Sequence, residues 1–134
     1  MAGYSSTPLA KKLGIVAGAT VHLIGGPAEY SALLAPLPDS VTFVARPSKT
    51  TRLVHLFTVS RVELESVLTR LRPAIAPDAA VWVSWPRKSA RVPTDITENV
   101  IREVALPMGF VDIKVCAVSD VWSGLKLVIR RELR

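Results

Sequence analysis

Hydrophobic and polar positions follow two different periods along this chain, and the changes of period mark the predicted elements. Six short runs of β-branched and apolar residues predict strands at residues 19–24, 41–44, 53–59, 79–85, 110–118 and 125–131. Longer stretches with apolar residues every three or four positions lie between them and predict amphipathic helices. The chain therefore mixes helices and strands, with a hairpin formed by the last two strands.

Two helices are predicted in the first third of the chain. Residues 7–13 form the first one, with Pro8 at its first helical position. The second opens at Pro27, after the turn at Gly25 and Gly26 that ends the first strand. Residues that favour helix ends lie at the ends of both stretches.

Two longer helices begin at capping boxes, in which a polar side chain and an acidic residue three positions later cap each other. Ser60 with Glu63 begins one helix, which Pro73 ends. Asp95 with Glu98 begins the other. This cap accounts for both carboxylates more simply than an acid and base pair does.

The order of elements predicts one α/β domain over residues 1–134. We expect a three-layer, Rossmann-like fold with a mostly parallel six-stranded sheet that ends in an antiparallel hairpin. The second and third strands lack a joining helix, but eight extended residues reach about 26 Å, enough to return along a strand of about 18 Å. The predicted strand order is two, one, three, four, six, five, with only the last strand antiparallel. The alternative is an α+β fold whose first three strands form an antiparallel meander.

This layout resembles the sheet of class I methyltransferases from which one helix–strand–helix unit is missing. The resemblance implies a ligand beyond the carboxyl ends of the strands, near Gly25, Gly26 and Arg46. A site for S-adenosylmethionine takes spaced glycines and an acidic residue after the second strand, but this chain has one glycine pair and Arg46. We therefore predict no cofactor. Arg46 and the helix opening at Pro27 favour an anion such as phosphate.

Two further passages carry candidate binding residues. Trp85 and Lys88 lie where a buried strand runs into a basic loop, and Asp120 and Trp122 lie in the turn of the last hairpin. A tryptophan can stack on a flat ligand, but it fills a core equally well. Because Trp82 and Trp85 differ by three positions, they should face opposite sides of the sheet.

Five motifs resemble the signatures of a bacterial family of short proteins that carry a domain of unknown function. They are TPLAKKLG at residues 7–14, WPRK at 85–88, VPTD at 92–95, and KVCAV at 114–118 with WSGL at 122–125. The resemblance spans essentially the whole chain and implies a bacterial cytosolic protein, and it carries no catalytic role to any residue. At Ile113 the sequence departs from the family pattern, in which an asparagine is expected.

The net charge and the distribution of basic residues indicate which kinds of partner the chain can bind. The chain carries a net charge of +6, and its basic residues cluster at 46–52, 87–91 and 130–134. These clusters suit an anionic small molecule or a partner protein and, more weakly, nucleic acid, although a solvated basic surface is the simpler interpretation. With 49% hydrophobic residues, some apolar surface is expected to lie against another subunit. No apolar run is long enough for a membrane span and the start does not resemble a secretory signal, so we predict a cytoplasmic protein.

Candidate catalytic and metal-binding groups are few. Cys116 is the only cysteine, which excludes an internal disulfide and a cysteine-cluster metal site, and it should pack as a small hydrophobe. His22 and His55 fall in apolar runs and are best interpreted as core histidines, although they approach each other if the first and third strands are neighbours. No serine lies in a glycine-flanked nucleophile elbow.

Three functional hypotheses follow. The leading one is a non-enzymatic domain that binds a partner protein or an anionic small molecule at the strand ends. The second is a reduced S-adenosylmethionine-dependent methyltransferase. The third is nonspecific nucleic-acid binding through the basic clusters, with an affinity that falls steeply with salt.

Overall fold

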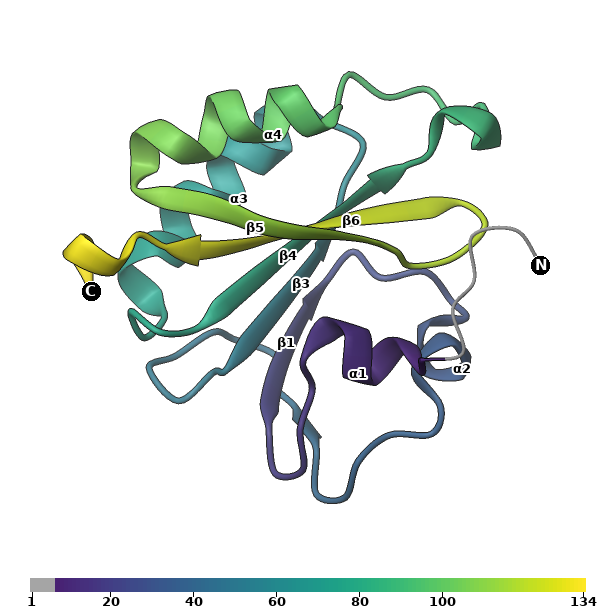
Figure 1. Ribbon diagram of the computed structural model, residues 1–134, viewed down its shortest axis with the longest axis vertical. Coiled ribbons are helices and arrows are strands. Elements are labelled where there is room, and N and C mark those ends of the chain that lie inside the picture. Colours follow the sequence, from purple (N-terminus) through teal and green to yellow (C-terminus); the bar gives the residue numbers. More distant parts are fainter. Residues whose placement is uncertain (1–6) are drawn as a thin grey trace.

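Six strands form one mixed sheet in the computed structural model, which describes residues 7–134 (Figure 1). The order across the sheet is β2-β1-β3-β4-β6-β5. β1 is parallel to β2 and β3, and β3 is parallel to β4, whereas β6 is antiparallel to both β4 and β5. The strand bounds are β1 Thr20–Ile24, β2 Thr42–Phe43, β3 Leu53–Phe57, β4 Ala80–Pro86, β5 Phe110–Ala117 and β6 Trp122–Ile129. The predicted strand order is confirmed, and the antiparallel meander is wrong.

The connection between β2 and β3 needs no helix, because β2 is short and the chain has only a short distance to return. β2 pairs only with the first two residues of β1, through Thr20 with Thr42 and Val21 with Phe43. The chain therefore leaves the sheet well before the carboxyl end of β1. It rejoins at Arg52, whose backbone N–H donates to the carbonyl of Thr20 at 2.9 Å.

The two helices in the first third of the chain are shorter than predicted. α1 spans Leu9–Leu13 and α2 spans Tyr30–Leu34. Pro8 occupies the N-cap position of α1 rather than its first helical position. α2 does not open at Pro27, because the Pro27 carbonyl accepts from the N–H of Tyr30 in a turn that precedes the helix.

The two longer helices, α3 (Arg61–Ala74) and α4 (Glu98–Ala105), begin with different caps. Ser60 caps α3 as predicted, because its side chain accepts from the backbone N–H of Glu63. The predicted box of Asp95 and Glu98 is wrong. Thr97 caps α4, and Asp95 Oδ1 instead accepts from the backbone N–H of Arg61 at 2.7 Å, at the start of α3.

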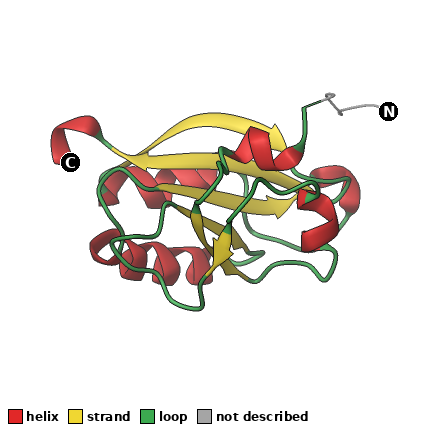
Figure 2. Ribbon diagram, turned by 90° about the horizontal axis from the view of Figure 1, so that it is seen from below, coloured by secondary structure: helices red, strands yellow, loops and turns green. Residues whose placement is uncertain are grey.

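Helices lie on both sides of the sheet, as Figure 2 shows. α3 and α4 cover one face, here the α3–α4 face, whose cluster includes Leu64, Leu68 and Trp85. α1 and α2 cover the other, the α1–α2 face, whose cluster includes Leu13 and Trp82. The prediction that Trp82 and Trp85 face opposite sides is confirmed. Within residues 7–134, no helix is long and apolar enough to cross a membrane.

Candidate functional site

A cavity of about 650 Å³ opens at the carboxyl end of β4, between that strand and the start of α4. Its wall combines apolar side chains with a basic loop and the first residue of α4. The lining residues are Trp85, Pro86, Arg87, Lys88, Arg91, Val92, Pro93, Thr94, Ile96, Thr97 and Glu98. We call it the β4–α4 pocket.

The loop that forms the pocket, residues 87–97, is fixed at both ends. The backbone N–H of Arg87 donates to the carbonyl of Val121 at 2.7 Å, which ties the loop to the turn between β5 and β6. At the other end, Thr94 Oγ1 donates to the carbonyl of Val59 at 2.8 Å, and Ile96 is buried in the core. The pocket is therefore built on rigid elements, although a loop encloses it.

Three cations line this pocket and leave it positively charged. Arg87 is half-buried, and Lys88 and Arg91 are exposed. None of the three takes part in an ion pair with another residue in the described part of the chain. The one carboxylate in the lining, Glu98, accepts from Arg102 at 2.8 Å and is thereby engaged on α4. An anion that enters meets cationic side chains and the positive end of the α4 dipole.

Trp85 gives the pocket an apolar wall. Its side chain packs in the cluster of the α3–α4 face, and only 8% of the residue is exposed. An indole held in this way contributes an edge rather than an open stacking surface. The pocket thus suits a small ligand with a charged group and an apolar part.

A second cavity, of about 460 Å³, lies at the ends of β1 and β2, where a methyltransferase-like sheet would hold its cofactor. It is lined by Leu23, Pro27, Ala28, Tyr30, Ser31, Phe43, Val44 and Ala45. This lining contains no carboxylate to bind the hydroxyl groups of a ribose. The second strand and the residues directly after it supply only Phe43, Val44 and Ala45 here.

The glycines after β1 are required by the protein's own packing. Gly25 has a φ of +69°, and a Cβ there would lie 2.7 Å from the backbone oxygen of Phe57. A Cβ on Gly26 would lie 2.6 Å from the side chain of Leu23. Because the chain itself fills the space beside both glycines, they do not form an open cradle for a ligand. The residues present do not fit S-adenosylmethionine.

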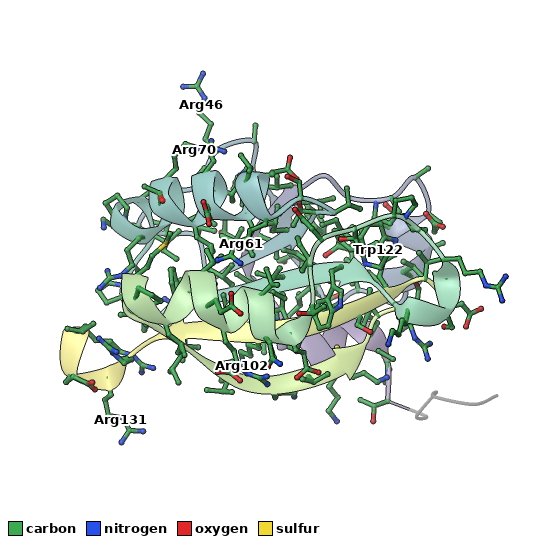
Figure 3. The ribbon with its side chains drawn as sticks, turned by 90° about the horizontal axis from the view of Figure 1, so that it is seen from above. Arg46, Arg61, Arg70, Arg102, Trp122 and Arg131 are labelled. Carbon is green, nitrogen blue, oxygen red and sulfur yellow. The ribbon has the colours of Figure 1, made fainter. Side chains whose placement is uncertain are left out.

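The structure separates the candidate site residues into groups. Trp85 and Lys88 come together in the β4–α4 pocket. Trp122 packs edge-to-face on Phe57 with ring centroids 5.0 Å apart, near the glycine turn, and Asp120 is exposed in the hairpin turn next to it. Arg46 stands apart from all of these, because β2 ends early, and it points into solvent (Figure 3).

The basic clusters lie at opposite ends of the strands. The loop from Arg87 to Arg91 follows the carboxyl end of β4. Arg52 precedes β3, at the end of the sheet where β3 and β4 begin. Arg130 follows β6 and lies at the same end, because β6 is antiparallel to β4. Arg52 also pairs with Asp78 at 3.1 Å, which partly neutralises the positive charge there. The three clusters therefore do not form one face.

The two histidines lie on neighbouring strands but face opposite sides of the sheet. His22 is paired with Val54 and His55 with Leu23, which places one imidazole on each face. His22 Nδ1 lies 2.9 Å from the carbonyl oxygen of Val44, to which it donates. Among the described residues no group of three or more histidine, cysteine or acidic side chains is arranged to hold a metal ion.

A buried chain of polar groups crosses the α1–α2 face, and nothing in the sequence pattern predicts it. The Tyr30 hydroxyl lies 2.8 Å from His55 Nδ1, and His55 Nε2 lies 2.7 Å from the Ser84 hydroxyl. Burial lowers the pKa of His55 to about 3 and raises the pKa of Tyr30 well above its ordinary value. His55 and Ser84 are fully buried, so these groups serve packing rather than chemistry on a substrate.

Comparison with solved structures shows the fold. The chain matches a candidate type 11 methyltransferase from Sulfolobus solfataricus at 15% identity and a TM-score of 0.64, over 91% of this chain and 89% of that one. It matches the DhpI–SAH complex at 15% identity and a TM-score of 0.61, over 92% of this chain and 83% of that one. It matches a SAM-dependent methyltransferase from Aquifex aeolicus at 14% identity and a TM-score of 0.62, over 91% of this chain and 88% of that one. No family model and no curated protein matches the chain. At these identities the chain has a methyltransferase-like α/β fold.

Proposed function

We propose that this domain binds a small anionic ligand in the β4–α4 pocket. The observation that carries the proposal is the set of three cations, Arg87, Lys88 and Arg91, that line one cavity without a carboxylate paired to any of them in the described chain. Trp85 supplies an apolar wall. The pocket lies beyond the carboxyl end of a parallel strand, where ligands of α/β folds bind.

The size and charge of the pocket define the class of ligand. A volume of about 650 Å³ lies in the range of small-molecule sites. Arginine takes carboxylate or phosphate in a bidentate manner, and lysine adds a point charge. A phosphorylated metabolite or a mononucleotide satisfies both the charge and the apolar wall.

Isothermal titration of a panel of mononucleotides, sugar phosphates and dicarboxylates tests this proposal. A variant with Lys88→Gln and Arg91→Gln should bind any hit about tenfold more weakly or worse. The matched control carries Arg70→Gln and Arg131→Gln, two exposed arginines away from the pocket, and removes the same charge. Equal loss in both variants would assign the effect to net charge. No heat with any member of the panel at millimolar concentration would refute the small-ligand site.

The second candidate function is S-adenosylmethionine-dependent methyl transfer, and the fold comparison favours it. One of the matched structures is named as a SAM-dependent methyltransferase, and another is named as a complex with SAH. Opposed to it are the lack of a carboxylate in the lining of the β1–β2 cavity and the two glycines that pack on Phe57 and Leu23. These local features lead us to rank ligand binding above methyl transfer.

A thermal-shift assay separates the two candidates. A cofactor present at 100 times its Kd stabilises the folded state by about 2.7 kcal/mol, which raises Tm by several degrees in a domain of this size. The anion-binding proposal expects no shift with S-adenosylmethionine or S-adenosylhomocysteine. A saturable rise in Tm with either compound would instead support the methyltransferase.

A further inference from the structure

Three lysines gather on the α1–α2 face, away from the β4–α4 pocket. Lys114 of β5 and Lys126 of β6 are directly opposite each other in the antiparallel pair, so their side chains share a face. Lys126 is also opposite Trp82, whose indole N–H donates to the carbonyl of Leu13 at 2.8 Å. That hydrogen bond places α1 on the same face, where it carries Lys12.

Two of the three lysines lie close enough to affect each other, because Lys114 lowers the pKa of the Lys126 ammonium, which burial lowers more strongly. A Cβ at Gly14, just after α1, would lie 3.9 Å from Lys126 Nζ. Lys12 and Lys114 both lower the pKa of the half-buried Cys116 thiol, which burial raises more strongly. We call Lys12, Lys114 and Lys126 the lysine patch.

The patch costs stability within this chain. Like charges directly opposite on paired strands destabilise a sheet. None of the three lysines forms an ion pair with any residue from 7 to 134. An anionic partner would remove the repulsion.

The edge strand β5, which lies beside the lysine patch, can contact the same partner. β5 is the edge strand, so within residues 7–134 one side of its backbone has no neighbouring strand. Val115 is opposite Leu125 of the α3–α4 face and is 49% exposed. Lys114 and Val115 therefore present a charge on one face and an apolar side chain on the other.

These features discriminate between occupants. A second copy of this chain would bring its own Lys114 to the same edge, where the like charges would repel each other. Single-stranded nucleic acid that binds without sequence preference stacks its bases on aromatic side chains, but Trp82 is fully buried and Trp122 packs on Phe57. An extended acidic polypeptide fits both the charge and the edge.

We propose that the β5–β6 hairpin, with Lys12, is a docking surface for an acidic segment of a partner protein. The segment adds to β5 as a strand, directs alternate carboxylates towards the lysine patch, and places apolar side chains against Val115. This proposal does not depend on the β4–α4 pocket.

Fluorescence anisotropy with a labelled eight-residue peptide of alternating glutamate and valine tests the proposal. We expect saturable binding that weakens with salt and that Lys114→Glu reduces at least tenfold. The same substitution creates an attractive pair with Lys126, so Tm should rise slightly, by about 2 °C. Loss of binding in a variant that is at least as stable cannot be ascribed to unfolding.

The matched control is Lys11→Glu, which makes the same charge change at an exposed neighbour of Lys12. It should retain most of the affinity. Equal weakening by Lys11→Glu and Lys114→Glu would overturn the proposal in favour of a diffuse charge effect. An eight-nucleotide oligothymidine that binds more tightly than the peptide, or the absence of peptide binding at low salt, would overturn it too.

Discussion

The two faces of the sheet place their polar groups differently. On the α3–α4 face the polar contacts lie at the rim, where Ser60 and Thr97 cap helices and Asp95 accepts from the backbone of Arg61. On the α1–α2 face the polar chain that includes His55 lies in the middle of the core.

The lengths of the covering helices account for this difference. α3 has 14 residues and α4 has 8, so each presents an apolar stripe to the sheet and needs polar partners only at its ends. α1 and α2 have 5 residues each and provide little apolar cover. The hydroxyl of Tyr30 on α2 then needs a buried partner, which His55 supplies.

The largest effect expected from this contrast is on the pH dependence of stability. Because burial lowers the pKa of His55 to about 3, the unfolded chain binds a proton below pH 6.5 that the folded chain rejects. The free energy of unfolding should therefore fall as the pH is lowered, by about 3 kcal/mol between pH 6.5 and pH 4 from this group alone. Urea denaturation at a series of pH values measures the slope, and His55→Gln should flatten it. An unchanged slope in this variant would show that His55 is not the group responsible.

Removal of one oxygen from the middle of the α1–α2 face should cost less. Ser84→Ala leaves His55 Nε2 buried without its partner, so we expect a loss of about 1–3 kcal/mol in the free energy of unfolding. Exposed Ser66→Ala on α3 is the control and should change stability by less than about 0.5 kcal/mol. Equal effects in chemical denaturation would remove the distinction between a polar core and a polar rim.

The smallest effect is expected at the rim. Asp95→Ala removes the acceptor for the backbone N–H at the start of α3, and it should lower the free energy of unfolding by about 1 kcal/mol. Hydrogen exchange should locate the loosening in the first turn of α3. Loosening at the start of α4 would instead favour the capping role that the sequence pattern predicts for Asp95.

The sequence was informative where periodicity and burial agree. The order of the six strands and the cap at Ser60 follow from local patterns and from a few rules on connections. Trp85 and Lys88 were identifiable as candidate residues because a basic loop follows a buried strand. Their placement in one cavity is a property of the structure alone.

The features that the sequence did not predict depend on distant contacts. Asp95 caps α3 rather than α4 because the loop before α4 lies against the start of α3, 34 positions away in the chain. Arg46 lies apart from the glycine turn because β2 contains only two residues. The hydrogen bond between Tyr30 and His55 spans 25 positions, and no short window of sequence contains both partners.

The position of β6 determines when the sheet can be completed. β6 follows β5 in the chain but lies between β4 and β5, so β5 has no strand to join until β6 is present. A chain being synthesised that has reached the end of α4 therefore leaves one edge of β4 open to other polypeptides. We expect a stalled or prematurely ended chain to be prone to aggregation at that edge, and the β5–β6 hairpin closes it in a single step.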